Sequence, residues 1–375
     1  MRRLDWGDVP ADTMATVLDE ERHRWTKQLE WDLGDSLALI ERARTDRQLP
    51  GIVVRDRASR VAGWSFYLLR NEILEVGAMV GRSASVLREL LDAVFESPEA
   101  GLARGLSCFV FPTSPSLGSA LTRRHFGVTA FPYLTRDLGA GLRPTSELAH
   151  TAIRVRGWTD ADAIGSVRLL CSAYAGTTTE RCFAPNGELV EWAQYLGQLL
   201  GSPGCGTFVP AWSVVAEDRA TRAIVGVTIA TRVASRTAHI AQVAIDPEFQ
   251  GRGLGERLVL ESAGLARAAA STRLTLLVSE DNAAARALYR RLGFEQTAEF
   301  LFASRARPAR RASVTAREGA IIPATFGTAR EGAVTPANAG VQVRARVVEA
   351  YASGLGHPRV STSDALETAG AMTRR

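Results

Sequence analysis

The length and composition of the chain favour an ordinary globular protein. With 375 residues it can form two domains with separate cores, and its 46% hydrophobic and 23% charged residues are typical of soluble proteins. No apolar run is long enough to span a bilayer, and no apolar region follows the basic residues at the N-terminus. We therefore expect a cytoplasmic protein without a membrane partner.

The positive charge of the chain lies at its C-terminal end. Residues 305–375 hold eleven arginines against five acidic residues, which leaves 34 basic and 35 acidic residues in 1–304. Because this main part is close to neutral, its composition disfavours a nucleic-acid partner. The four cysteines form no paired motif and have no histidine at ligand spacing, so we expect free thiols and no metal.

The first part of the chain is predicted to contain helices, three strands, a helix, a strand, a helix and a strand. Apolar periodicity and turn residues set their limits. In chain order we expect helices over 11–25 and 33–44, strands over 52–55, 61–69 and 73–80, a helix over 85–95, a strand over 106–111, a helix over 117–125 and a strand near Tyr133.

The same order of elements begins again in the second part. We expect a strand over 153–155, a helix opened by a capping box of Thr159 and Asp162, a loop over 176–187, a helix over 188–200, a hairpin of strands over 212–217 and 223–232, strands over 238–245 and 274–278, and a helix over 281–292. The similar segments Leu121–Val128 and Leu288–Phe294 occupy the same place in this order. A duplication follows, with domains at 1–137 and 151–304 joined by a linker over 138–150.

The segment 305–375 differs from the rest of the chain. Ala, Arg, Gly, Thr and Pro dominate it, and aromatic residues are nearly missing. This composition is typical of a disordered tail. The arginines are spread out rather than clustered, which favours an extension without a function over an arm that binds nucleic acid or a membrane.

A glycine-spaced loop, Gln250–Gly255, lies between a predicted strand and a predicted helix. Glycines at 251, 253 and 255 let the backbone approach a ligand closely, and the following helix adds its unpaired N–H groups and the positive end of its dipole. Together they suit a pyrophosphate. The loop lacks the Gly-Lys-Ser/Thr of a P-loop and the spacing of a dinucleotide-binding fingerprint. A turn that only changes the chain direction is the alternative.

The residues around this loop form a larger pattern. V-A-I-D-P-x-x-Q-G-x-G-x-G over Val243–Gly255 is followed by a helix, a strand and N-x-x-A-x-x-L-Y-x-x-x-G-F over Asn282–Phe294. This order resembles the GNAT superfamily of acyl-CoA-dependent N-acetyltransferases over residues 152–304, and more weakly over 1–137. The resemblance implies an α/β (α+β) fold of two tandem GNAT-like domains, each with a mixed, mostly antiparallel twisted sheet flanked by helices. The first copy is degenerate and lacks the glycine loop.

The resemblance also implies roles for individual residues. In this family acyl-CoA lies between two parallel strands that splay apart, here 238–245 and 274–278. The amide of Val243 is then the oxyanion donor, and Tyr289 protonates the departing thiolate, unless it only packs with its hydroxyl at the surface. The residues expected to bind acetyl-CoA are Val243, Ala244, Ile245, Gln250, Gly251, Arg252, Gly253, Leu254, Gly255, Glu256 and Asn282.

The general base has several candidates. His239 has a side chain whose ordinary pKa lies near neutrality, and strand alternation places it on the same face as Val243. An isolated histidine in a strand can equally be structural. Glu217, Glu280 and Gln242 with a bound water are the rivals.

Three functions remain open. The first is transfer of an acetyl group from acetyl-CoA to a primary amine of a small molecule by direct attack. The second is acetylation of a macromolecular amine, on a protein or aminoacyl-tRNA, and the third is acyl-CoA sensing without catalysis. Tyr289 beside an intact loop favours catalysis. The acceptor depends on loops such as Gly176–Gly187 and Gly201–Thr207, from which neither the acceptor nor the oligomeric state follows.

The tail generates the first prediction. Because its composition cannot supply a packed core, a protein truncated at Ser304 should retain its activity. Comparison of acetyl transfer by the truncated and full-length chains tests this, and loss of activity on truncation would contradict it.

Overall fold

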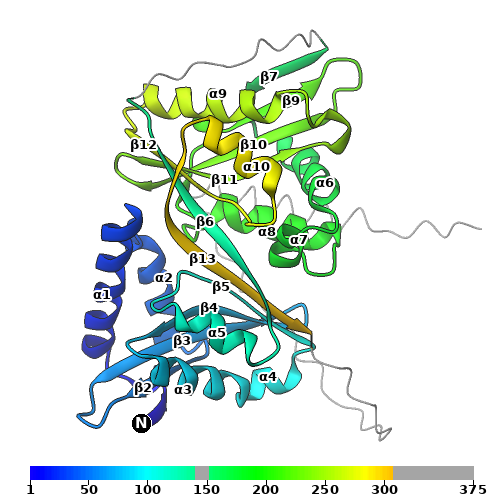
Figure 1. Ribbon diagram of the computed structural model, residues 1–375. Coiled ribbons are helices and arrows are strands. Elements are labelled where there is room, and N and C mark those ends of the chain that lie inside the picture. The colour runs from blue at the N-terminus through cyan, green and yellow to red at the C-terminus, as the bar shows by residue number, and fades with distance from the viewer. Residues whose placement is uncertain (140–151, 307–375) are drawn as a thin grey trace, which may run out of the picture.

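The computed structural model of the protein describes residues 1–139 and 152–306. These residues form two halves, each a sheet with helices packed on it (Figure 1). The N-terminal half contains β1 (Arg2–Asp5), η1 (Trp6–Asp8), α1 (Ala11–Leu29), α2 (Gly34–Thr45), β2 (Gly51–Arg55), β3 (Val61–Arg70), β4 (Ile73–Gly81), α3 (Ala84–Phe95), α4 (Pro98–Leu102), β5 (Gly105–Val110), α5 (Ser116–Thr122) and β6 (Gly127–Asp137).

The C-terminal half repeats this order with small additions. It contains β7 (Ile153–Gly157), α6 (Asp162–Tyr174), α7 (Thr178–Phe183), α8 (Leu189–Gly201), β8 (Thr207–Phe208), η2 (Pro210–Trp212), β9 (Val214–Asp218), β10 (Ile224–Ala234), β11 (Thr237–Ile245), η3 (Pro247–Phe249), α9 (Leu254–Ala268), β12 (Arg273–Leu277), α10 (Ala283–Arg291) and β13 (Glu295–Ala306).

The two halves share one sheet because each half's last strand pairs with the other half. The order is β1-β2-β3-β4-β5-β13-β6-β12-β11-β10-β9-β7, with β8 paired to β10. Within it, β13 adds to β5, β6 adds to β12, and β6 and β13 pair with each other, all antiparallel. Figure 1 shows these two long strands running diagonally between the halves. The expected mixed α+β class is confirmed, but the two expected sheets are one.

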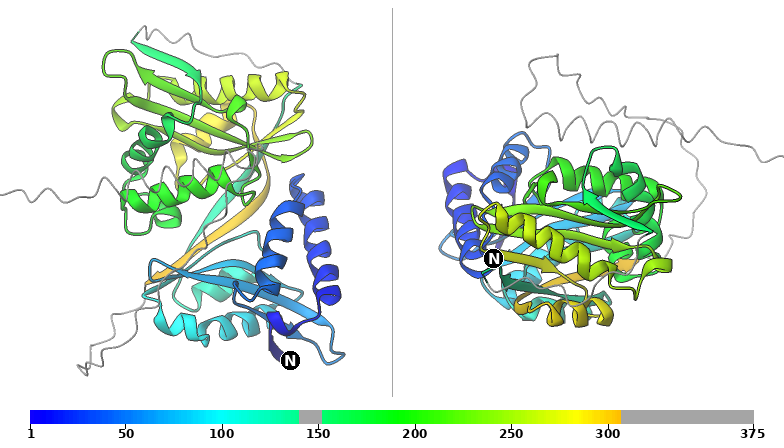
Figure 2. Two further views of the ribbon diagram at one scale, coloured as in Figure 1. Left: turned by 180° about the vertical axis from the view of Figure 1, so that it is seen from behind. Right: turned by 90° about the horizontal axis from the view of Figure 1, so that it is seen from above.

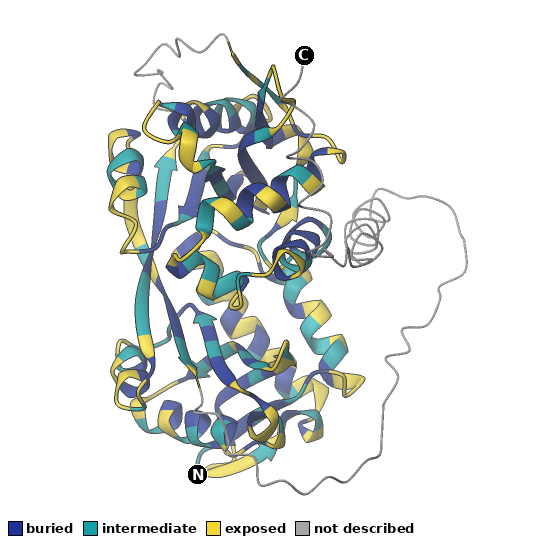
Figure 3. Ribbon diagram, turned by 90° about the vertical axis from the view of Figure 1, so that its right-hand side faces the viewer, coloured by how far each residue is buried: buried dark blue, intermediate teal, exposed yellow. Residues whose placement is uncertain are grey.

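Helices cover both faces of the sheet in each half, as Figure 2 shows from two sides. In the N-terminal half α3 and α5 pack on one face, and α1 and α2 pack on the other. In the C-terminal half α9 and α10 oppose α6 and α8. Figure 3 shows the buried residues along the strands and on the inner sides of the helices. No helix in 1–139 or 152–306 is both long enough and apolar enough to cross a bilayer.

The duplication extends to the details of strand pairing. In the N-terminal half the parallel pair β4–β5 ends at Val76 and Cys108, and a β-bulge leaves Gly77 without a partner on β3. In the C-terminal half the parallel pair β11–β12 ends at Ile240 and Leu276, and a bulge leaves Ala241 unpaired with β10. The repeated order predicted from the sequence is therefore confirmed in the geometry, although the domain limits of 1–137 and 151–304 stay a prediction.

Several expected elements differ from the structure. The predicted loop over 176–187 contains helix α7, because the Thr177 side chain accepts a hydrogen bond from the amide of Glu180. Thr159 and Asp162 form only half of the predicted capping box: the Asp162 carboxylate accepts from the Thr159 amide and hydroxyl, but the Asp162 amide donates to the Thr159 carbonyl rather than to its hydroxyl. Strands β1, β8 and β13 were not predicted. The predicted tail lies outside the described residues, except that β13 continues to Ala306.

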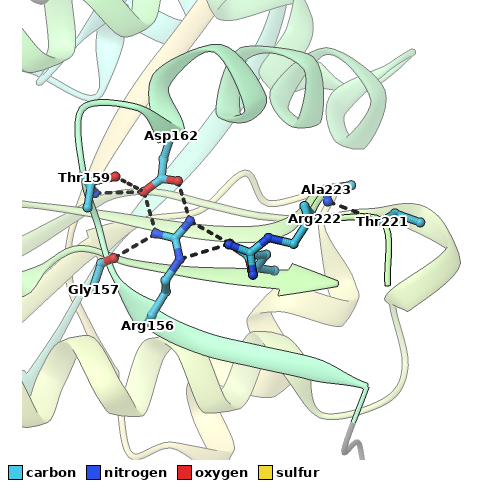
Figure 4. A network of polar contacts seen from close by, with 8 residues as sticks. Arg156, Gly157, Thr159, Asp162, Thr221, Arg222 and Ala223 are labelled. Atoms are coloured by element: carbon cyan, nitrogen blue, oxygen red, sulfur yellow. Dashed lines mark hydrogen bonds and ion pairs between the residues drawn. The ribbon is translucent and has the colours of Figure 1, made fainter. Parts of the chain in front are cut away.

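A buried ionic network attaches β7 and α6 to the sheet of the C-terminal half. Figure 4 shows the Arg156 guanidinium facing Asp162, with Arg222 nearby. Arg156 bonds both Asp162, at 2.7 Å, and Glu217 of β9, at 2.9 Å. Burial alone raises the pKa of Asp162, but hydrogen bonds from Arg156 and Thr159 outweigh it and leave this pKa below its usual value. The network therefore fixes the edge strand β7.

The paired strands predict where truncation is tolerated. Arg305 donates a hydrogen bond to the Arg124 carbonyl, and its guanidinium lies 5.0 Å from the Phe126 ring centroid, so contacts with the fold continue past Ser304. A chain ending at Ala306 should melt like the full-length protein. A chain ending at Phe294 loses β13, uncovers β5 and β6, and should fail to fold in both halves. Thermal melting of both variants tests this, and a folded N-terminal half in the shorter one would contradict it.

Candidate functional site

Val243 and Asn282, two of the residues predicted to bind acyl-CoA, lie at the separating ends of β11 and β12, and the predicted glycine loop follows the end of β11. The strands pair from Thr237 to Ile240, after which no β11–β12 pairing is described. A cavity of about 300 Å³ lies at this point. Its lining includes His239–Val243 of β11, Leu276–Ser279 at the end of β12, and Asn282 and Tyr289 of α10. The splayed strands expected from the resemblance are therefore present.

The bulge at Ala241 changes which side chains share a face. Because Ala241 is an extra residue, the alternation shifts by one, and Ile240 and Val243 both pack in the cluster around α9. His239 lies on the opposite face, with Gln242 and Ala244 next on that face. The prediction that His239 and Val243 share a strand face is therefore wrong, since plain alternation does not allow for a bulge.

The backbone of Val243 faces the cavity. Its carbonyl accepts a hydrogen bond of 2.7 Å from the Tyr174 hydroxyl, which also lies 2.8 Å from the side-chain oxygen of Gln242. The N–H and C=O of a strand residue point to the same side, so the Val243 amide is also directed away from β10. The side-chain nitrogen of Gln242 in turn donates to the Tyr195 hydroxyl at 2.5 Å. This geometry supplies an N–H group beside the cavity.

The glycine loop is shaped for close backbone approach. Gly251 and Gly253 have φ values of 72° and 79°, in the left-handed region that favours glycine. Gln250 donates from its side chain to the Ile245 carbonyl at 3.0 Å, which ties the loop to the end of β11. In the described part of the chain the amides of residues 251–255 make no hydrogen bond. Their free donors precede α9, which begins at Leu254 without a side-chain cap.

Two further loop residues have side-chain contacts of their own. The Arg252 guanidinium lies 5.6 Å from the Phe249 ring centroid, and buried Glu256 lies 3.9 Å from Arg291. The loop therefore offers its backbone rather than these two side chains to an anion, as expected for a pyrophosphate site.

Helix α10 presents Asn282 and Tyr289 to the cavity. Asn282 is the N-cap of the helix and accepts from the Ala285 amide at 3.1 Å. Tyr289 is buried, and its ring contacts Phe294 edge to face at 5.7 Å. Burial raises the pKa of Tyr289 above its usual value, which keeps the hydroxyl protonated. Tyr289 therefore does not lie at the surface.

His239 is enclosed by aromatic rings. Its ring centroid lies 4.8 Å from Trp31 and 6.2 Å from Tyr133, and its Nδ1 is 2.9 Å from the Thr275 hydroxyl. Full burial lowers the pKa of His239 to about 3. The argument that this imidazole titrates near neutrality is therefore wrong, because it assumed a hydrated side chain.

The other candidate bases differ in whether they line the cavity. Glu217 is held by Arg156 and Arg222 and does not line the cavity. Glu280 is also outside the lining, and its carboxylate accepts from the Ala130 amide at 2.9 Å. Gln242 lines the cavity. The four cysteines are free, and within 1–139 and 152–306 no cluster of three potential ligands could hold a metal ion.

Residues of the N-terminal half complete the cavity, and sequence analysis missed them. Glu21 and Trp25 come from α1, Trp31 follows it, and Gly77–Val80 and Phe109–Phe111 come from the separating ends of β4 and β5. The separating strands of both copies thus open onto one cavity. Tyr174 and Tyr195 were also missed, since each falls on a helical pattern that reads as core.

In the N-terminal copy, side chains form hydrogen bonds with backbone amides whose counterparts in the described C-terminal copy have no side-chain partner. Ser83 caps α3 by accepting from the Val86 amide, and the Thr113 hydroxyl bonds both the N–H and the C=O of Gly81 at the end of β4. No equivalent side-chain cap exists at α9. The anion site and the open strand end are therefore features of the second copy among the described residues.

The buried imidazole generates a prediction about pH. His239 stays neutral in the folded protein down to about pH 3, whereas the unfolded chain protonates it near pH 6.5. The unfolded state therefore binds more protons between these values. The contribution of His239 to the free energy of unfolding is complete above pH 6.5 and falls toward pH 3, by at most about 1.4 kcal/mol per pH unit. Melting between pH 4 and 8 should show a steeper acid loss of Tm in the wild type than in His239→Asn, and parallel curves would contradict this.

Comparison with known proteins agrees with the geometry. The model of the acetyltransferase (GNAT) family matches residues 174–294. A search of curated proteins finds no match. A GCN5-related N-acetyltransferase from Sphaerobacter thermophilus has a similar structure, with a TM-score of 0.56 and 17% identity over 84% of this chain and 98% of that one.

Two further solved structures are similar. The GCN5-related glucosamine N-acetyltransferase region of a fungal multi-domain GH3 beta-N-acetylglucosaminidase has a TM-score of 0.51 and 14% identity, over 81% of this chain and 38% of that one. A tandem GNAT protein from the clavulanic acid biosynthesis pathway has a TM-score of 0.48 and 18% identity, over 70% and 84%. At these identities the likeness to the Sphaerobacter protein and to the fungal region shows the fold alone. The family match therefore identifies residues 174–294 as an acetyltransferase (GNAT) domain, and the structural likeness shows the same fold over most of the chain.

Proposed function

We propose that the protein transfers an acetyl group from acetyl-CoA to a primary amine of a small molecule, by direct attack of the amine on the thioester. The observation that carries this proposal is that the unpaired edge of β11 at Val243 and the buried Tyr289 line one cavity. The free amides before α9 lie outside this lining, a few residues further along the chain from Val243. Each feature corresponds to one part of an acyl-CoA reaction.

Acetyl-CoA binds mainly to backbone groups of the protein. The pyrophosphate of acetyl-CoA accepts hydrogen bonds from the amides of residues 251–255, assisted by the dipole of α9. The pantetheine arm then follows the edge of β11 as an added strand does. For this the Tyr174 hydroxyl, now on the Val243 carbonyl, turns to its other partner, Gln242. The acetyl carbonyl comes to lie at the Val243 amide.

The chemistry proceeds through a tetrahedral intermediate. The amine nitrogen forms a bond to the acetyl carbon, and the negative charge on the carbonyl oxygen is stabilised by the Val243 N–H. When the carbon–sulfur bond breaks, Tyr289 donates its proton to the thiolate. Its raised pKa ensures that the proton is present throughout the neutral range. The amide product and the free CoA thiol then leave.

The attacking amine must lose a proton. We assign this step to a water molecule held by Gln242, because Gln242 lines the cavity and its amide is already oriented by Tyr174 and Tyr195. The low pKa of His239 makes it a poor proton acceptor at neutral pH. His239 is therefore assigned a structural role.

The role of Tyr289 is tested by removing one oxygen atom. Tyr289→Phe should lower kcat about 100-fold, the usual contribution of a general acid, and leave the KM for acetyl-CoA nearly unchanged. Tyr67→Phe is the matched control, because Tyr67 is a buried tyrosine of the N-terminal half outside the cavity. CoA thiol release measures both. Full turnover by Tyr289→Phe would remove the acid role, and binding of acetyl-CoA without turnover of any amine by the wild type would indicate a sensor.

The anion site at the glycine loop is tested by adding one methyl group to the loop. Gly253→Ala forces a side chain into the left-handed region at φ 79°, at a cost of about 1–2 kcal/mol, so the KM for acetyl-CoA should rise about tenfold. The control is Gly264→Ala in the same helix α9, where an added methyl group meets no atom within 4 Å. An equal effect of both substitutions would argue against an anion site at the loop.

A further inference from the structure

The cavity has a catalytic wall and an acceptor wall from different halves of the chain. The catalytic wall holds Val243, Asn282 and Tyr289, and it takes the acetyl-pantetheine arm in the proposed function. The opposite wall comes from α1, β4 and β5, and β4 carries the bulge at Gly77. Whatever side chains line that wall decide which amine fits beside the thioester.

Aromatic rings dominate the acceptor wall. Trp25 contacts Phe111 and Phe300 edge to face at 5.6 and 5.5 Å, and Phe111 stacks on Phe300 at 5.1 Å. Phe109 meets Phe131 at 4.9 Å. Such contacts fix the rings before a ligand arrives, so the wall is a preformed apolar surface. The exchanged strands build it, since Phe131 lies on β6 and Phe300 on β13.

One charged side chain lines the cavity among the described residues, and it is already neutralised. The Glu21 carboxylate accepts two hydrogen bonds from Arg24, at 2.6 and 2.9 Å, and one from the Trp25 indole at 2.7 Å. Arg24 is itself fixed by the Phe111 and Pro112 carbonyls. A second cation on an acceptor would lose its water here without gaining a free counter-charge, and a polyol would lose hydrogen bonds.

The size of the cavity limits the acceptor further. A volume of about 300 Å³ is at the lower end for ligand pockets and is shared with the end of the pantetheine arm. Beside the thioester it leaves room for a body of about the size of a single ring. A long acyl chain on the donor is the competing occupant of the same apolar wall.

On the basis of the proposed function, we infer that the acceptor is a primary amine on an apolar, ring-sized body, which the N-terminal half holds between its aromatic side chains. The amine reaches the thioester at Val243 while the ring lies against Phe109 and Phe111. The degenerate copy is then the specificity half of the enzyme.

The test compares acceptors with the full-length protein and acetyl-CoA. The kcat/KM for 2-phenylethylamine should exceed those for spermidine and glucosamine about 100-fold, because an apolar site leaves their polar groups unpaired. Comparable or better use of spermidine, glucosamine or a lysine peptide would overturn the inference and leave acetyl transfer standing. Higher kcat/KM with octanoyl-CoA than with acetyl-CoA would also overturn it, since the ring wall would then hold the acyl chain. Bound acetyl-CoA without transfer to any amine would instead refute the proposed function.

Substitution in the wall locates the ring. Phe109→Ala should raise the KM for 2-phenylethylamine about tenfold with an unchanged KM for acetyl-CoA, and Phe109→Leu should restore most of the loss. Phe95→Ala is the matched control, because Phe95 packs on Phe126 outside the cavity. Melting curves report whether each variant is folded. An unchanged KM for 2-phenylethylamine in Phe109→Ala would contradict the placement.

Discussion

The hydrogen bonds between β6 and β13 hold the whole molecule together. A strand left unpaired exposes a row of donors and acceptors, and each half ends in a sheet edge, β5 or β12, that needs one more strand. The chain satisfies both edges by crossing over, so that each half is completed by the other. The two halves are therefore fixed relative to each other by backbone pairing, and the cavity between them has a defined shape.

The two copies differ where the chemistry requires it. Both retain the parallel strand pair, the separation that follows it and the bulge, which together open a cleft in a sheet. In the first copy, the hydroxyls of Ser83 and Thr113 accept hydrogen bonds from backbone amides near the cleft. These amides therefore need no ligand as a hydrogen-bond partner. In the second copy the glycine loop leaves its amides available. A few hydroxyl groups thus distinguish a structural copy from a binding copy.

The sequence predicts the local parts of this site well. The apolar run of β11, the left-handed glycines and the helix of Tyr289 each have a signal within a few residues. The exchange of β6 and β13 has none, because it depends on pairing between residues such as Leu301 and Val110. The aromatic wall was missed for the same reason. The burial that lowers the pKa of His239 likewise comes from the rings of Trp31, after α1, and Tyr133 of β6 rather than from its own strand.

Some errors were avoidable from the sequence. Thr177 and Glu180 are three residues apart at the start of α7, which is the spacing of a capping pair, and the Glu180 carboxylate does reach back to the Gly176 amide. The threonines between them have weak helix propensity, which favoured a loop. The bulge at Ala241 could not have been predicted in this way, because an alanine in a strand does not indicate a bulge. The corresponding Gly77 in the first copy was the better indicator.

The pairing of β13 with β5 has a consequence for the order in which the protein folds. The strand that completes the N-terminal sheet is the last one of the described fold to be synthesised. Until it emerges from the ribosome, β5 lacks a neighbour on one side, and early native contacts cannot close the first half. During synthesis the first half therefore keeps β5 unpaired on one side. Both halves then complete their sheets together, in one folding transition.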